Sequence, residues 1–196
     1  MATTFTRMDE STPEQWQAIG QAVRRSNQRA ADRVLAMLRS LEEIRDEFAT
    51  DQLEHSLQTA TRAERAGADL EVVIAALLHD VGKAATIHNH GAIAAEILRP
   101  YVRDDVYQMV RIHQDFQGLH FFHHLGGDRD AREKHRDQVS PEVFALTARF
   151  ADEWDQTSFD PDYDTESVEH FEPALRALFD RPQIAVGAPT DPDQAA

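Results

Sequence analysis

The sequence predicts an all-α protein, and three observations support this fold class. Apolar residues recur at helical spacing along most of the chain, as they do from Val34 to Leu41. Helix-starting residues and helix-ending glycines or prolines bracket these segments. No segment alternates apolar and polar residues for long enough to indicate a β-strand. A chain of 196 residues can bury one sizeable core, so we expect a single helical domain over residues 1–180.

Four helices are expected in the first half of the chain. The segment Ser11-Thr12-Pro13-Glu14 has the pattern of a capping box with proline in the first turn, and it opens the first helix. Thr50 or Asp51 can cap the third helix, which Gly67 ends, and Asp69 can cap the fourth. The predicted spans of the second, third and fourth helices are 30–48, 52–66 and 70–79.

Four more helices are expected in the second half, where prolines and glycines separate the apolar segments. Their predicted spans are 90–98, 104–113, 140–154 and 167–179. The tail, residues 181–196, contains three prolines and ends in Asp-Gln-Ala-Ala. This composition predicts a disordered tail.

The composition excludes several classes of partner and of metal site. The chain has 20 Lys and Arg against 35 Asp and Glu, and a net charge of −15 disfavours binding to nucleic acid or to anionic membranes. No segment has the length of an apolar transmembrane helix, and Met1–Arg7 lacks the features of a signal peptide. We therefore expect a soluble cytoplasmic protein with a small-molecule partner; the sequence does not indicate its oligomeric state. Because there is no cysteine, a metal site would need imidazoles and carboxylates.

His79 and Asp80 directly follow the most apolar segment of the chain, Leu70–Leu78. A helix that is apolar on every side is buried, so these two polar side chains are carried into the interior. Their burial without partners would be costly, and a metal ion would satisfy both. A histidine such as His55, in the middle of the preceding predicted helix, is more often an ordinary buried residue, but a histidine 24 residues before a His-Asp pair also fits a metal ligand.

Three further positions could supply ligands. His90 begins one predicted helix and His113 ends the next, although both places also suit histidines that bind no metal. Asp152 and Asp155 are three residues apart, which would place them on one face of an α-helix. Either aspartate could complete the set.

The pattern of His55, His79-Asp80 and a later aspartate resembles the HD superfamily, whose signature is H…HD…D on a helical bundle. The resemblance covers roughly residues 51–163 and implies an HD-domain helical bundle. The form His79-Asp80-Val81-Gly82-Lys83 is similar to the HDxGK sequence found in phosphohydrolases and in oxygenases alike. It therefore indicates the fold more firmly than the reaction.

Dinuclear members of the superfamily take ligands for a second metal from the positions of His90 and His113. His90, and not His88, stands in the family's register with the segment 95–98.

The oxygenase branch of the superfamily places its last ligand directly after an aromatic residue, which favours Asp155 after Trp154. Many hydrolytic members instead have an Ala-Asp pair, which would favour Asp152. We take Asp155 as the ligand and Asp152 as a residue that either supports the metal ligands or faces the substrate.

Gln52–Gln58 and Ala75–Asp80 are similar to the organophosphonate-cleaving branch of the mixed-valent diiron oxygenases. This resemblance implies an O2-dependent enzyme with two iron ions, Fe(II)/Fe(III), that hydroxylates C1 of a 1-hydroxyphosphonate. The carbon–phosphorus bond would break to give phosphate and a carboxylate. Asp80 would bridge the irons, with one bound by His55, His79 and Asp155 and the other by His90 and His113.

The substrate contacts differ from those of the branch member that acts on 2-amino-1-hydroxyethylphosphonate. That enzyme has a histidine at the position of Lys83 in this chain and an arginine at the position of Asp152. Near the position of Gln117 it has a phosphonate-binding lysine. An aspartate and aromatic rings suit a quaternary ammonium group, so we expect (R)-1-hydroxy-2-(trimethylammonio)ethylphosphonate as the substrate and glycine betaine as the product. Lys83 and Arg129 are the expected phosphonate-binding cations. The candidate aromatic residues are Phe116, Phe121, Phe122 and Trp154.

Two other functional classes fit the same residues. A metal-dependent phosphohydrolase could use a dinuclear site to generate hydroxide, and it would be favoured if Asp152 bound the metal. A helical binding module without catalysis would use the histidines only as structural residues.

Overall fold

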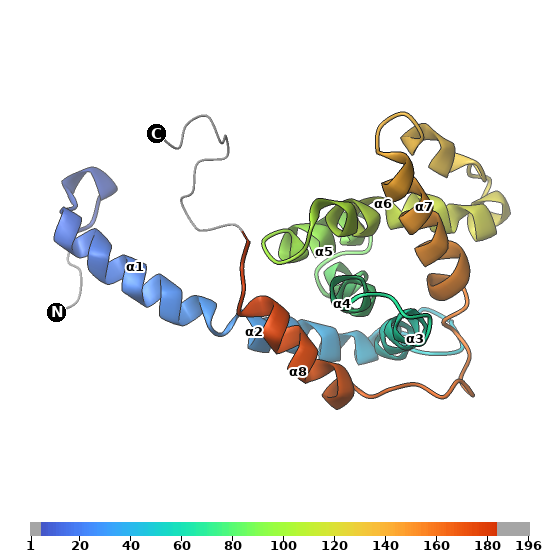
Figure 1. Cartoon of the computed structure of the whole chain (residues 1–196), viewed down its shortest axis with the longest axis horizontal. Helices are drawn as coiled ribbons and strands as arrows, with labels where there is room; N and C mark the ends of the chain where they lie inside the picture. The colour runs from blue at the N-terminus through green and yellow to red at the C-terminus, as the bar shows by residue number, and fades with distance from the viewer. Residues whose placement is uncertain (1–4, 184–196) are drawn as a thin grey trace.

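The computed structural model of the chain describes residues 5–183. Within that range the chain forms eight α-helices, several short 3₁₀ segments and one π-helix, and it contains no β-strand (Figure 1). This confirms the predicted all-α fold class. The helices are α1 (Pro13–Asn27), α2 (Ala30–Ser40), α3 (Gln52–Arg65), α4 (Leu70–Leu78), α5 (His90–Leu98), α6 (Asp104–Phe121), α7 (Pro141–Arg149) and α8 (Val168–Phe179).

Helix α4 is the centre of the bundle. Every residue from Val72 to Leu78 is buried, as expected for a segment without a polar face. Helices α3, α6 and α8 pack against it, and α5 packs on α6 (Figure 1). Helix α4 therefore ends inside the bundle between α3 and α6, and His79 and Asp80 follow it there.

Two predicted helices have different lengths in the structure. The helix expected over 30–48 ends at Ser40, because the apolar periodicity stops at Leu41 and the next residues are mostly charged. Asp46 and Glu47 have left-handed backbone conformations, with φ of 46° and 64°, and they turn the chain back toward α3. Helix α6 continues past its predicted end at His113 to Phe121.

Gly118 does not interrupt α6, although glycines in this part of the sequence were expected to separate helices. A Cβ atom at Gly118 would overlap the ring of Phe122. This glycine therefore allows a close approach of a side chain to the helix, and its conformational freedom is not used.

The segment expected as one helix over 140–154 has two parts. Ser140 caps α7 by accepting a hydrogen bond from the backbone N–H of Val143, and α7 ends at Arg149. Residues Phe150–Asp155 then form a π-helix. π-Helical segments are rare in proteins, and those that occur are often found at functional sites.

Two expectations concern the ends of the chain and the membrane. The predicted disordered tail, 181–196, lies outside the described residues from position 184 onward. Within the described range, the backbone N–H of Gln183 donates to the carbonyl of Pro100 at 2.6 Å. No helix among residues 5–183 is long and apolar enough to cross a membrane.

Candidate metal centre

Six residues predicted as metal ligands converge in the interior of the bundle. They come from helices α3, α5 and α6, the turn after α4 and the end of the π-helix, and each is at most 4% exposed. Burying so many polar groups is costly unless each has a partner. The six residues are His55, His79, Asp80, His90, His113 and Asp155.

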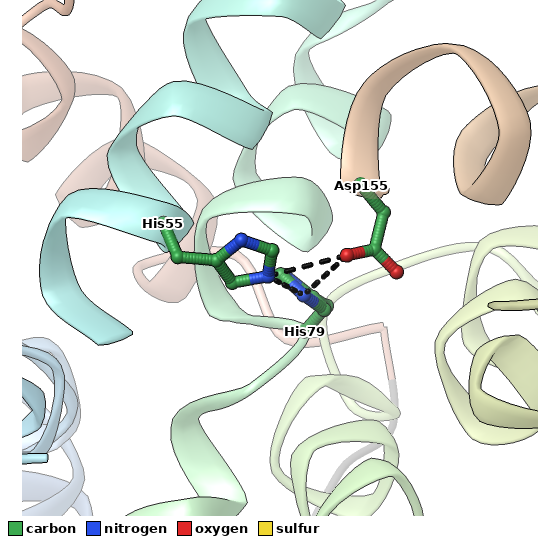
Figure 2. Close-up of side chains that lie close together, drawn as sticks. All are labelled: His55, His79 and Asp155. Carbon is green, nitrogen blue, oxygen red and sulfur yellow. Dashed lines mark hydrogen bonds and ion pairs between the residues drawn. The ribbon is translucent and has the colours of Figure 1, made fainter. Parts of the chain in front are cut away.

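His55, His79 and Asp155 form the first group, called here the Asp155 group (Figure 2). The two Nε2 atoms lie 3.2 Å apart, and Oδ1 of Asp155 lies 3.2 Å from that of His55 and 3.7 Å from that of His79. Oδ2 of Asp80 approaches the same two nitrogens at 3.4 and 3.3 Å. Three side chains and one oxygen of Asp80 thus surround a single point.

His90 and His113 form the second group, called here the His90 group. Their Nε2 atoms lie 3.0 and 3.6 Å from Oδ1 of Asp80. Asp80 therefore directs one carboxylate oxygen to each group, which is the arrangement of a bridging ligand. His79, Asp80 and His113 are also close enough together to hold one ion.

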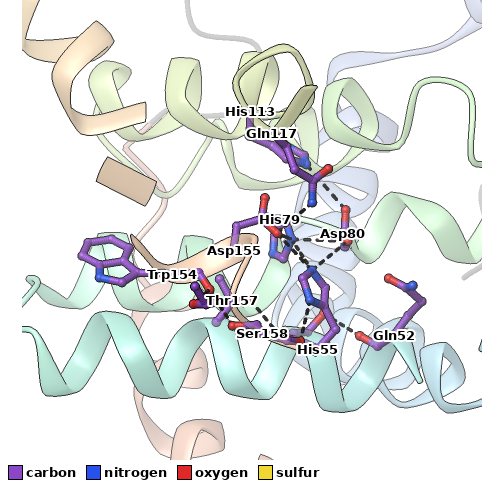
Figure 3. A network of polar contacts seen from close by, with 12 residues as sticks. Gln52, His55, His79, Asp80, His113, Gln117, Trp154, Asp155, Thr157 and Ser158 are labelled. Carbon is purple, nitrogen blue, oxygen red and sulfur yellow. Dashed lines mark hydrogen bonds and ion pairs between the residues drawn. The ribbon is translucent and has the colours of Figure 1, made fainter. Parts of the chain in front are cut away.

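Each of the four imidazoles is oriented by a backbone carbonyl. Nδ1 of His55 lies 2.9 Å from the carbonyl of Ser158 (Figure 3), and the other three contact the carbonyl three residues before them at 2.6–2.8 Å. A carbonyl only accepts, so Nδ1 carries the proton and Nε2 presents its lone pair to the centre. Metal-binding histidines are oriented in this way.

Two close backbone approaches keep the His90 group near Asp80. A Cβ atom at Gly82 would lie 2.2 Å from the carbonyl oxygen of His90. A Cβ atom at Gly91 would lie 3.0 Å from Cε1 of His113. Only glycine at Gly82 therefore lets the start of α5 lie against the turn that follows α4.

Three buried atoms of the centre lack a hydrogen-bond partner among the described residues. They are Oδ1 of Asp80, Nε2 of His113 and Oδ2 of Asp155. Leaving such atoms unsatisfied is destabilising, and a cation would satisfy all three. The donors are imidazole nitrogens and carboxylate oxygens, which suit iron, manganese or zinc. The buried clusters are consistent with a binuclear metal site.

The charges of the centre shift the pKa values of its members. Burial alone would lower the pKa of His79, but the negative charges of Asp80 and Asp155 raise it to about 10. Burial also opposes ionisation of Asp155, yet His55 and His79 hold its pKa far below the usual range. Burial lowers the pKa of His113. Without metal, the centre thus retains a proton on the Asp155 group at neutral pH.

The structure places Asp155, and not Asp152, with the histidines. The side chain of Asp152 is 33% exposed and lies 3.0 Å from Arg132 and 2.9 Å from His120. The expectation that the two aspartates share one face is wrong, because residues 150–155 form a π-helix, in which positions three apart are not aligned as in an α-helix. Asp152 therefore neutralises Arg132 outside the cluster.

Three polar residues surround the metal-ligand candidates. Nζ of Lys83 lies 2.6 Å from Oδ2 of Asp80 and 2.8 Å from Oε1 of Gln52. Nε2 of Gln117 donates to Oδ1 of Asp155 at 3.0 Å (Figure 3). Sequence reasoning did not identify Gln52, although its position one helical turn before His55 could have suggested it.

Arg129 lies outside this arrangement. Its side chain is directed to the end of α6, where Nε donates to the carbonyl of Leu119 at 3.1 Å, and the contact is exposed.

Aromatic residues contact the centre at a place that the sequence did not reveal. The ring of Phe159 stacks on that of His55 at 4.3 Å between centroids, and Phe48 stacks on Phe159 at 4.6 Å. Among the rings expected to contact substrate, those of Phe116 and Trp154 are buried in the core.

Comparisons with known proteins agree with this geometry. The model of the HD domain family matches residues 53–160, which is more than half of the chain. The match begins in α3 before His55 and ends after Asp155, so it includes every member of both groups. A search of curated proteins found no significant match to this chain.

Proposed function

This chain belongs to the HD domain family, and we propose that it is a dinuclear iron oxygenase that cleaves the carbon–phosphorus bond of a 1-hydroxyphosphonate. The observation that most supports the proposal is the position of Asp80, which presents one oxygen to the Asp155 group and the other to the His90 group. A carboxylate in this position can hold two metal ions close together.

The number of donors leaves room for reactants. With Asp80, the Asp155 group offers four protein donors and the His90 group offers three. Because these residues would not fill the coordination of two metal ions, the site would leave room for the substrate and for O2. The bound irons would supply the redox chemistry. The protein residues would fix the ions, exclude water and hold the substrate.

The proposed reaction is balanced without an added reductant. A compound R–CH(OH)–PO₃²⁻ and O2 give R–COO⁻, HPO₄²⁻ and H⁺. The C1–H, C–P and O–O bonds break, and C1 and phosphorus each gain one oxygen atom. The hydrogens from C1 and from its hydroxyl group end as protons on phosphate and in solution. The substrate loses the four electrons that O2 gains, so no external reductant is needed.

Asp155 supports the oxygenase over the alternative phosphohydrolase. In the resemblance described above, the aspartate after an aromatic residue belongs to the oxygenase branch, and Asp155 follows Trp154. Its contacts with His55 and His79 fit the role of last ligand. Asp152, the position expected of a hydrolytic member, contacts Arg132 instead.

The proposed substrate is (R)-1-hydroxy-2-(trimethylammonio)ethylphosphonate, which would yield glycine betaine and phosphate. The acidic character of the chain favours a cationic group. The ring of Phe48 stacks on Phe159, which in turn stacks on His55, and Phe48 is 46% exposed. It therefore offers an aromatic face near the centre, and a quaternary ammonium prefers such faces.

The test is phosphate release from a panel of 1-hydroxyphosphonates by iron-loaded protein under air and under nitrogen. We expect release only under air, with one O2 consumed per phosphate. A phosphate monoester on the same panel tests the alternative. Equal release with and without O2 would contradict the oxygenase and favour a phosphohydrolase.

A further inference from the structure

Within residues 5–183, helix α1 does not pack along any other helix, and the ring of Phe5 lies 6.0 Å from that of Trp16. Helix α1 extends away from the rest of the bundle (Figure 1), and none of its 15 residues is buried. Trp16 is 45% exposed and Val23 is 41% exposed. An isolated helix of this length is marginally stable in water, so a helix with such exposed apolar residues is expected to pack against something.

The apolar residues of α1 lie on one face. Trp16, Ile19, Gly20 and Val23 follow the spacing i, i+3, i+4 and i+7, which forms a single stripe. This stripe lines one side of a groove of about 610 Å³. Tyr101 and Phe179, stacked at 4.2 Å, line the other side.

We propose that this groove receives α1 of a second copy of the chain, and that the two α1 helices pack antiparallel around Gly20. Each copy would place its apolar stripe against that of the other copy and against the Tyr101–Phe179 wall. The contact is the same from both sides, as in a two-fold symmetric dimer.

The charges of α1 favour the antiparallel direction. Glu14 lies in its first turn, and Arg24 and Arg25 lie in its last turn. Asp9 and Glu10 lie in the short 3₁₀ turn before α1, where Arg7 pairs with both and leaves this end with a net negative charge. Residues 15–23, between the two ends, carry no charge. Two antiparallel copies bring each acidic end beside a basic end, whereas parallel copies would place like charges together.

The shape of the apolar stripe also suits packing against the stripe of a second, antiparallel copy. When two α1 helices cross near Gly20, Ile19 of each copy faces the glycine of the other, and Trp16 faces Val23. The surface at Gly20 is open, because the nearest atom to a Cβ there would be Nη1 of Arg24 at 3.8 Å. A glycine inside a helix lowers helix stability, so its use here is explained by a close approach of a second helix.

The first experiment measures the mass of the full-length protein in solution by sedimentation equilibrium. We expect a dimer at micromolar concentration. Ile19→Asp should raise the dimer dissociation constant at least about a hundredfold, because it places a charge in the apolar contact. Ala18→Asp adds the same charge on the opposite face of α1 and should leave the dissociation constant unchanged. A monomer at concentrations up to about 100 µM would overturn the proposal.

Two more variants separate a contact between copies from a free arm. Gly20→Leu raises the helix propensity of α1 but fills the space that Ile19 of the other copy needs, so the dimer should weaken about tenfold or more. A free arm would become more helical with no change in mass, and that result would contradict the proposal. Circular dichroism reports the helicity of each variant.

Charge reversal tests the direction of packing. Arg24→Glu with Arg25→Glu should weaken the dimer, and adding Glu10→Arg with Glu14→Arg should restore it. Failure of the fourfold variant to recover the dimer, while its iron content stays normal, would exclude the antiparallel arrangement.

Discussion

The ammonium group of Lys83 lies 2.6 Å from Oδ2 of Asp80, the carboxylate oxygen that faces His55 and His79. Gln52 accepts a second hydrogen bond from the same ammonium group at 2.8 Å. The charge of Lys83 thus offsets a carboxylate that is almost fully buried. A phosphonate that bound to Lys83 would share this cation with Asp80.

Lys83→Met should therefore change two properties. In the metal-free protein it removes one of the two cations beside the buried Asp80 carboxylate, protonated His79 being the other. We expect a loss of roughly 2–4 kcal/mol in the free energy of unfolding. Bound iron replaces the missing charge, so the loss should be smaller in the iron-loaded protein. Denaturant unfolding with and without iron measures both values. If Lys83 also holds the phosphonate, the KM for phosphonate should rise, whereas an unchanged KM would remove it from the substrate site.

Metal content should depend on the two groups separately. We expect about two irons per chain, because Asp80 links two sets of donors. His79→Ala and Asp80→Ala should lose most of the metal, and His113→Ala should retain about one ion. His135→Ala, a buried histidine paired with Asp115 outside the centre, is the matched control and should retain both. Elemental analysis that finds one zinc or manganese per chain, and no mixed-valent resonance after partial reduction, would contradict the prediction.

Asp155→Asn and Asp152→Asn should have different effects on iron content and turnover. The first removes a charge that contacts His55 and His79, so metal content and turnover should fall together. The second disturbs only the pair with Arg132 and the contact with His120, so iron should remain bound. Iron analysis and phosphate release on the same preparations compare the two variants. The opposite pattern would support the hydrolytic alternative.

The affinity of the centre for Fe(II) should rise with pH. The pKa of His79 is raised to about 10 from 6.5, so a metal that binds at neutral pH displaces its proton. Release of one proton makes the apparent affinity rise about tenfold per pH unit in this range. Titration calorimetry under nitrogen, in buffers of different ionisation enthalpy, counts the protons released. An affinity that does not change with pH would show that His79 is neutral before metal binds.

The same pKa has the opposite consequence for the metal-free protein. A group whose pKa is raised on folding stabilises the folded state below its unfolded pKa, here 6.5, and this contribution is lost as pH rises through about 10. Metal-free protein should thus lose stability over that interval as pH rises, while the metal-bound protein should not.

The substrate preference should favour the trimethylammonium compound over its unmethylated analogue. A quaternary ammonium against ring faces and near a carboxylate gains about 1–2 kcal/mol, which is roughly five- to thirtyfold in kcat/KM. Asp152→Asn should reduce the preference, since it removes the carboxylate and leaves the charge of Arg132 uncompensated. Phosphate release from both compounds measures the ratio. An equal or reversed preference would exclude the quaternary-ammonium assignment.

The candidate ligands could be predicted from the sequence because they follow from patterns in the adjacent residues. Leu70–Leu78 is apolar throughout, so the position of His79 and Asp80 at its end required burial. The caps at Asp51 and Asp69 were also visible, and both accept the expected hydrogen bonds. Helix periodicity therefore predicted most of the bundle.

What the sequence did not predict depends on contacts between distant segments. The π-helix that separates Asp152 from Asp155 has no local signature, because its residues would also fit an α-helix. Phe159 reaches His55 only after the chain has passed around the bundle, and the pairing of Gln52 with Lys83 joins α3 to the turn after α4. Pattern reasoning within one helix does not reveal such pairs.

Gly82 gives the centre a geometric dependence that its ligands alone do not have. The absence of one methyl group at this position lets the backbone of His90 lie against the turn that holds Asp80. With any larger residue, the start of α5 would have to move outward, and His90 would leave the second oxygen of Asp80 while the Asp155 group stayed intact. The difference between a protein that holds one metal ion and a protein that holds two can thus rest on a residue that binds neither.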